Sequence, residues 1–264
     1  MMISIVQKLK NYQLKEKEIA VCRLGQHSFL LKIADKLLAF DPYLSENKNR
    51  LIPPLIKPNE LADFDLIFGS HDHNDHIDRP ILSELTSGNA EFIFPKAIIN
   101  SINEIPHERI VGMTDGDKIN IQGVVIYAIG AAHEFFDQTI DGLYPYLGFV
   151  VKYKGVTIYH SGDCCIYDGL LSKIKKLSPN IMFLPINGRN ALRLKENCIG
   201  NMTYQEAADL AGWSNCQWVI PAHYDMFAKN SEDPQLFLDY VNIKYPQLNS
   251  FIINAGEILL IKLV

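Results

Sequence analysis

The sequence contains no long apolar run and no concentration of basic residues. No stretch approaches the roughly 18 apolar residues that a membrane-spanning helix needs, so we expect no membrane partner. Lys and Arg total 25 against 30 Asp and Glu, which gives a net charge of −5, and the basic residues do not cluster. Because nucleic-acid binding depends on clustered cations that displace counterions, we expect no nucleic-acid partner.

Cysteines are few and irregularly spaced. The chain has 5 of them, with no Cys-x-x-Cys pair: Cys22, Cys164, Cys165, Cys198 and Cys216. This odd number and spacing argue against a disulfide framework and against a thiolate zinc cage. The first residues also lack the apolar core and small-residue cleavage site of a secretory signal. We therefore predict a cytoplasmic protein with reduced thiols.

The order of the apolar segments indicates an α/β fold. The chain has 264 residues, 48% of them hydrophobic, which suits one domain spanning residues 1–264. Strand patterns come in runs early and alternate with helices late, so we expect two sheets with helices outside them. Strands are predicted at 19–24, 28–33, 37–40, 92–94, 118–121, 124–129, 146–153, 156–160, 181–184, 218–220 and 251–253, with a closing apolar segment at 257–263. Helices are predicted at 5–17, 79–85, 96–103, 170–177, 204–212 and 234–243, and Thr203 with Glu206 forms a capping box.

One loop concentrates metal-binding side chains. The segment 71–78, which follows the apolar run 65–68, holds three imidazoles and three carboxylates within eight residues. Its sequence is His71-Asp72-His73-Asn74-Asp75-His76-Ile77-Asp78. On a tight loop, His71 and His73 can point to one side, while Asp75 and His76 reach a second point nearby. Neutral imidazole suits borderline divalent ions, and carboxylate adds compensating charge. The loop therefore predicts a metal site.

Three further candidate ligands follow other predicted strands. His133 comes after the run 124–129, Asp163 after 156–160 and His223 after 218–220. Small residues stand beside each one and would allow close backbone approach. Taken singly each is a weak signal, but together with the loop they form an ordered set.

This ordered set resembles the metallo-β-lactamase superfamily. Within it, segments 70–78, 160–163 and 202–203 look most like the branch that contains ascorbate-6-phosphate lactonase. The resemblance implies a four-layer αββα sandwich and two divalent metal ions, zinc or manganese. It also implies a division of ligands: His71, His73 and His133 for one ion, Asp75, His76 and His223 for the other, and Asp163 as the bridge. The second loop position is His73 rather than an acidic residue, which favours hydrolysis over redox chemistry.

The function expected from this resemblance is metal-dependent hydrolysis. A metal-bound hydroxide would attack a small, anionic ester, lactone or phosphodiester. Asp75 and His223 are the expected catalytic residues, with Asp75 orienting the nucleophile and passing its proton on. A nuclease or phosphodiesterase acting on nucleic acid, and a non-catalytic metal-binding regulator, are the alternatives.

Substrate contacts are expected from the loops around the ligands. Arg189 could pair with a phosphate or carboxylate, or it could form an ion pair that holds its own loop. Asn187 precedes it on the same loop, and Tyr224 flanks His223, where it could meet substrate or simply pack. His27 is assigned a structural role. The resemblance also suggests a homo-oligomer.

Overall fold

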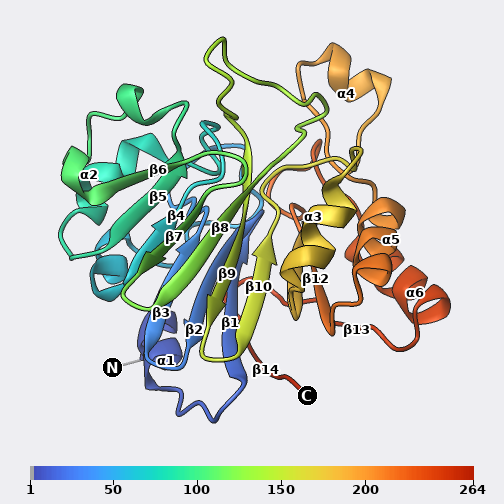
Figure 1. Cartoon of the computed structure of the whole chain (residues 1–264), viewed down its shortest axis with the longest axis horizontal. Helices are drawn as coiled ribbons and strands as arrows, with labels where there is room; N and C mark the ends of the chain where they lie inside the picture. Colours follow the sequence, from blue (N-terminus) through green and yellow to red (C-terminus); the bar gives the residue numbers. More distant parts are fainter. Residues whose placement is uncertain (1–2) are drawn as a thin grey trace.

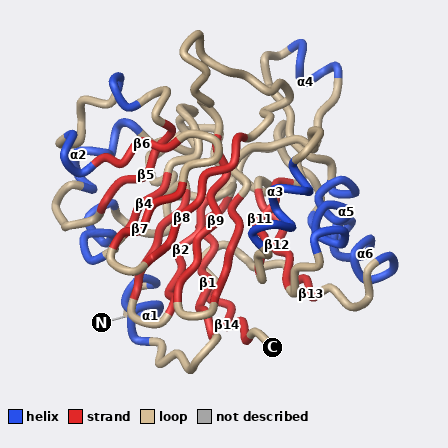
Figure 2. Tube along the Cα trace, in the orientation of Figure 1, coloured by secondary structure: helices blue, strands red, loops and turns tan. Residues whose placement is uncertain are grey.

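Two seven-stranded sheets face each other, and helices cover their outer sides (Figures 1 and 2). This computed structural model describes residues 3–264. The first sheet has the strand order β14-β1-β2-β3-β4-β5-β6 and the second β13-β12-β11-β10-β9-β8-β7. The predicted four-layer αββα sandwich is therefore confirmed.

The strands of the first sheet are β1 (Glu18–Gly25), β2 (Ser28–Ile33), β3 (Lys36–Phe40), β4 (Leu66–Phe68), β5 (Glu91–Pro95), β6 (Ile110–Met113) and β14 (Ile258–Lys262). Those of the second are β7 (Lys118–Ile121), β8 (Val124–Gly130), β9 (Leu147–Tyr153), β10 (Val156–His160), β11 (Ile181–Pro185), β12 (Trp218–Ala222) and β13 (Asn249–Ser250). The α-helices are α1 (Ile5–Asn11), α2 (Leu82–Leu85), α3 (Leu170–Leu177), α4 (Ala191–Lys195), α5 (Tyr204–Ser214) and α6 (Pro234–Lys244). Four 3-10 helices are η1 (Pro58–Asp63), η2 (Arg79–Ile81), η3 (Ile99–Ser101) and η4 (His107–Arg109).

Both faces of the central strands are buried, which explains their nearly continuous apolar sequence. Successive side chains of a strand point to opposite faces. In β1, Ile19 and Val21 enter the core between the sheets, whereas Ala20 and Cys22 pack beneath the outer helices. Aromatic rings fill the inner core, and the centroids of Phe29 and Phe183 lie 4.6 Å apart across it.

The strand directions bring the predicted metal-binding residues to one edge. Strands β10, β11 and β12 are parallel to one another. Strand β9 is antiparallel to both β8 and β10, so β8 runs in the same direction as β10. The segments that follow β8, β10 and β12 carry His133, Asp163 and His223. The loop after β4, in the facing sheet, carries the histidine-rich segment. Residues far apart in the chain therefore meet at one end of the sandwich.

Three predicted elements are wrong in extent or type. The first helix ends at Asn11 rather than at 17, because the chain turns away at Tyr12 and Lys17 adopts a φ of 59°. Residues 96–103 form only the short turn η3. Residues 251–253 form a loop rather than a strand. The side chains of Ile252 and Ile253 pack against the core from this loop. The predicted capping box of Thr203 with Glu206 is confirmed.

No helix within residues 3–264 is long and apolar enough to cross a lipid bilayer.

The packing of the inner core predicts a large stability loss for Phe183→Ala. The ring is fully buried, so its removal leaves a cavity that the two sheets cannot close. We expect the free energy of unfolding to fall by about 3–5 kcal/mol in urea denaturation followed by circular dichroism. The exposed Ile140 provides the matched control, since Ile140→Ala should leave stability within about 0.5 kcal/mol of wild type. Equal losses in the two variants would contradict this assignment of the core.

Candidate metal centre

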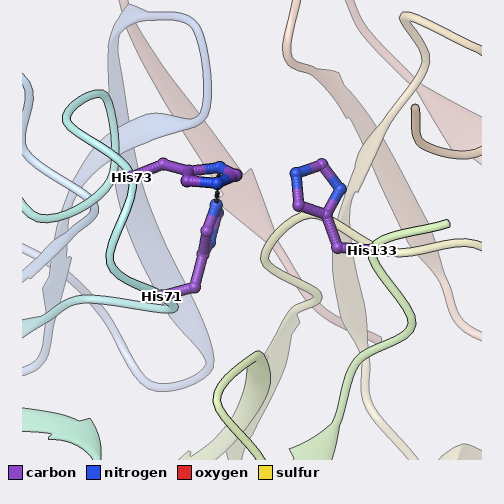
Figure 3. A group of neighbouring side chains, drawn as sticks. All are labelled: His71, His73 and His133. Atoms are coloured by element: carbon purple, nitrogen blue, oxygen red, sulfur yellow. Dashed lines mark hydrogen bonds between the residues drawn. The ribbon is translucent and has the colours of Figure 1, made fainter. Parts of the chain in front are cut away.

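The first predicted ligand group is assembled from two segments. His71 and His73 come from the loop after β4, and His133 approaches from the segment after β8 (Figure 3). One ring nitrogen of each histidine lies within 4.8 Å of the other two. The His71 Nε2 and His73 Nδ1 atoms are 2.9 Å apart. Three imidazoles thus converge on one point, as the loop spacing predicts.

The second group gathers beside the first. Asp75, His76 and His223 also place one ligand atom each within 4.8 Å of one another. His76 and His223 are buried, and Asp75 is partly exposed to the cleft. The loop after β4 therefore contributes to both groups.

Asp163 lies between the two groups. Its Oδ2 atom is 3.6 Å from His133 Nε2 and 3.0 Å from His223 Nε2. Its Oδ1 atom is 3.4 Å from His76 Nε2. One carboxylate consequently faces histidines of both groups, which is the position that the resemblance assigns to a bridge.

Neighbouring polar groups orient the histidines. The His76 Nδ1 atom is 2.6 Å from Asp41 Oδ2, so it donates a proton there and Nε2 turns toward Asp163. Ser70 Oγ donates to the same Asp41 oxygen over 2.7 Å and is 3.0 Å from His71 Nδ1. His133 Nδ1 donates to the carbonyl of Gly200 over 3.3 Å. Such contacts fix which ring nitrogen is left for a metal.

Burial sets the charge of the first group. It lowers the pKa of His71, His73 and His133, so these imidazoles are neutral at pH 7 and keep a lone pair. Burial acts the same way on His76, but the carboxylates of Asp163, Asp75 and Asp41 outweigh it and raise the His76 pKa well above its usual value. The second group therefore favours a positive charge at its centre.

The positions of the protons around Asp163 indicate that a cation fits between these side chains. In neutral His133 the proton is on Nδ1, so Nε2 presents a lone pair to an oxygen of ionised Asp163, 3.6 Å away. His223 and His76 keep the pKa of Asp163 well below its usual value against the effect of burial. His76 Nε2 and Asp163 Oδ1 are buried without hydrogen-bond partners. A lone pair on His133 Nε2 that faces the Asp163 carboxylate without a proton between them fits a divalent metal ion.

A glutamine not singled out from the sequence links the two predicted catalytic residues. The Gln26 amide nitrogen donates to Asp75 Oδ2 over 2.8 Å and is 3.2 Å from His223 Nε2. The backbones of the two loops are also joined, because His223 N–H donates to the Gln26 carbonyl over 2.8 Å. Gln26 and His223 both adopt left-handed conformations, with φ of 51° and 58°. Non-glycine residues tolerate this only where the surroundings hold them.

A buried arginine anchors the loop that carries His223. Arg23 is fully buried and donates to both carboxylate oxygens of Asp225, over 2.7 and 2.6 Å. It also donates to the Tyr224 carbonyl over 2.8 Å and stacks on the Tyr224 ring at 3.8 Å. Tyr224 is thereby only 2% exposed. Its ring packs on Arg23 and does not line the cleft, which is the packing role that the sequence left open beside a substrate contact.

The two other predicted substrate contacts, Arg189 and Asn187, are also absent from the lining of the cleft. Arg189 forms a two-point ion pair with Glu206, over 2.6 and 2.8 Å, which is the loop-holding role left open from the sequence. Asn187 is 1% exposed and donates to Asn230 over 2.7 Å. The cleft itself has a volume of about 370 Å³. Its lining comprises Tyr43, Asn47, His73, Asn74, Asp75, His133, Asp163, Asn197, Cys198, Ile199, His223, Phe227 and Asn230.

The structure brings His27 closer to the centre than its assigned structural role implies. Its Nδ1 atom is 3.5 Å from Asp163 Oδ1, and neither ring nitrogen has a hydrogen-bond partner. Burial lowers the His27 pKa to about 4, so the ring is neutral. Gln26 and His27 lie between β1 and β2, and Asp41 follows β3, so all three stand at early strand ends to which the sequence assigned no part in the centre.

Comparison with known proteins places this site in a family. The family model for a beta-lactamase superfamily domain matches residues 38–224. A metal-dependent hydrolase of the UPF0173 group from Thermococcus kodakarensis is 30% identical over 84% of this chain and 91% of its own length. A probable L-ascorbate-6-phosphate lactonase of Escherichia coli is 26% identical over 70% of this chain and 56% of its own length. The structure of a metallo hydrolase from Ignicoccus hospitalis shares the fold, with a TM-score of 0.73 and 20% identity over 94% of this chain and 100% of the other.

The matched region extends from β3 to the segment after β12 and so includes every residue of both histidine groups. With this coverage, and with relatives named as hydrolases over most of its length, the chain belongs to the metallo-β-lactamase superfamily and is a metal-dependent hydrolase.

Proposed function

We propose that the chain hydrolyses a small ester, lactone or phosphodiester with two divalent ions, zinc or manganese. His71, His73 and His133 would hold one ion, Asp75, His76 and His223 the other, and Asp163 would bridge them. The observation that carries this proposal is the meeting of the Asp163 carboxylate with histidines of both groups, at 3.0 to 3.6 Å. Imidazole suits zinc and carboxylate suits manganese, so the mixed set is compatible with both.

The division of work between the ions and the chain follows from the positions of the side chains. When bound, the ions would lower the pKa of a coordinated water and polarise the oxygen of the scissile group. Asp75 lines the cleft, and its Oδ2 atom is held by Gln26. Its other oxygen is left to orient the attacking group and to take up a proton. His223 contacts Gln26 and Asp163 and also lines the cleft, with its Nε2 atom 3.9 Å from Asp75 Oδ2.

The negative charge expected on the substrate would be bound close to the ions. The ester, lactone or phosphodiester group would meet the ions directly, at the bottom of the cleft lined by His73, His133 and Asp163. Two divalent ions carry more positive charge than the carboxylates of Asp75 and Asp163 remove. A negative scissile group is therefore favoured at that point.

Removal of one central side chain should reduce both metal binding and activity. For His73→Ala and Asp163→Ala, we expect the metal content to fall from about two ions per chain to one or fewer, and kcat/KM to fall by about 100-fold or more. Metal analysis of the purified protein and a panel assay with added Mn²⁺ or Zn²⁺ measure the two quantities. The panel contains a sugar-phosphate lactone, a cyclic nucleotide, a generic phosphodiester and a β-lactam.

The exposed His107 provides the matched control for this pair of variants, because it lies on η4 outside the cleft. His107→Ala should keep its metal and its turnover. Full activity in His73→Ala, or less than one ion per wild-type chain after reconstitution, would refute the proposed ligand set.

The hydrogen bond from His76 to Asp41 predicts a milder effect. Asp41→Asn keeps the shape of the side chain but weakens the acceptor that holds His76 Nδ1 and Ser70. We expect the dissociation constant of the metal to rise about 10–100-fold, measured by competition with a chromogenic chelator. Asp137→Asn, at an exposed position, is the control. An unchanged affinity in a folded Asp41→Asn protein, as judged by circular dichroism, would show that Asp41 does not position His76.

A further inference from the structure

Beyond the metal-binding groups, the wall of the cleft carries no charge. It is built from asparagines, two aromatic rings and two small apolar or weakly polar side chains: Tyr43, Asn47, Asn74, Asn197, Cys198, Ile199, Phe227 and Asn230. Within residues 3–264, no lysine or arginine is among the residues that line this cleft. A substrate tail that leaves the scissile group therefore meets amides and apolar surface.

The arginines nearest to this wall are engaged elsewhere. Arg189 is paired with Glu206. Arg193 donates to the backbone carbonyls of Asn187 and Ser231, the latter over 2.9 Å. Arg50 donates to the carbonyls of Tyr43 and Ser45 over 3.2 and 2.9 Å. Each guanidinium thus holds a loop in place, and none of the three lines the cleft.

A chain of amides fixes the direction of Asn230. Asn201 Nδ2 donates to Asn187 Oδ1 over 3.1 Å, and Asn187 Nδ2 donates to Asn230 Oδ1 over 2.7 Å. Because the Asn230 oxygen is used in this way, its amide N–H groups are left for the cleft. They suit a neutral acceptor, such as a carbonyl, carboxamide or hydroxyl oxygen.

An apolar surface lies on the same wall. The ring centroids of Tyr43 and Phe227 are 6.2 Å apart, and Ile199 completes the surface. The guanidinium of Arg50 covers the Tyr43 ring at 4.5 Å and holds it in place. Methylene or aromatic groups of a substrate would gain free energy here by leaving water.

We propose that the part of the substrate beyond the scissile group is uncharged, with an apolar segment against Tyr43, Phe227 and Ile199 and a hydrogen-bond acceptor for Asn230. This inference rests on the proposed function, and it confines any negative charge of the substrate to the group held by the ions. An ionised tail would lose water against neutral amides without gaining a counter-ion, which disfavours it.

Two acids of nearly equal shape test the inference on the zinc-loaded protein. Adipic acid carries a carboxylate at each end, whereas adipamic acid has a carboxamide in place of one. Both can present a carboxylate to the ions, so the difference in affinity reports the environment of the far end. After correction for the two equivalent ends of adipate, we expect adipamate to bind about fivefold or more tightly in isothermal titration calorimetry.

Two variants assign that preference to the wall. Asn47 is an exposed residue at the rim, so Asn47→Lys should fold normally and raise the relative affinity for adipate about fivefold. Asn230→Ala should weaken the binding of adipamate and leave the affinity for adipate nearly unchanged. Asn249→Lys, on β13 at the opposite end of β12 from His223, is the control and should match wild type. Equal or tighter binding of adipate by wild type, no binding of either acid, or an unchanged preference in Asn47→Lys would overturn the inference.

Turnover of p-nitrophenyl acetate, which has no tail, reports the proposed function separately. If the protein prefers adipamate but does not hydrolyse this ester or any member of the panel above, the uncharged wall is supported and the proposed reaction fails. If it hydrolyses the ester but prefers adipate, the reaction is supported and the uncharged wall is refuted.

Discussion

The buried carboxylate of Asp163 is the constraint on which the rest of the site depends. It is ionised in the interior and faces histidines from four other segments of the chain. A buried negative charge is costly unless positive charge compensates it. The neutral His133 ring cannot do so, because its one proton is directed to Gly200. Divalent ions would supply positive charge on that side of the carboxylate, and hydrogen bonds to Asp41, Ser70 and Gly200 position the surrounding histidines.

The framework around this centre is rigid for identifiable reasons. Asp41 and Ser70 hold His76 and His71 from the first sheet, while Arg23 clamps the segment after β12 through Asp225. His223, Gln26 and Asp41 all have left-handed backbone conformations, each of which costs about 1–3 kcal/mol. The two packed sheets offset this cost. Metal-binding side chains are therefore placed on loops whose ends are fixed by strands and whose middles are fixed by buried polar contacts.

Chemistry and selectivity are separated within one cleft. The charged groups gather at the bottom, where Asp75, Asp163 and the histidines lie, and the upper wall presents amides and aromatic rings. Most of the wall comes from the loop around Tyr43 and from residues between 197 and 230. Such a division allows one reaction to be directed to different substrates by loop composition.

The sequence by itself determined the sandwich of two sheets and the seven residues that now surround one point. Dense histidine and aspartate spacing after a strand is a strong local signal, and most strand limits agree within two residues because both faces are apolar. Local pattern did not reveal the ends of α1 and η3, or the roles of Gln26, His27 and Asp41. Nor did it show that Arg189 and Tyr224 do not line the cleft. Those outcomes depend on partners distant in the chain, such as Glu206 for Arg189 and Arg23 for Tyr224, and only tertiary packing brings such partners together.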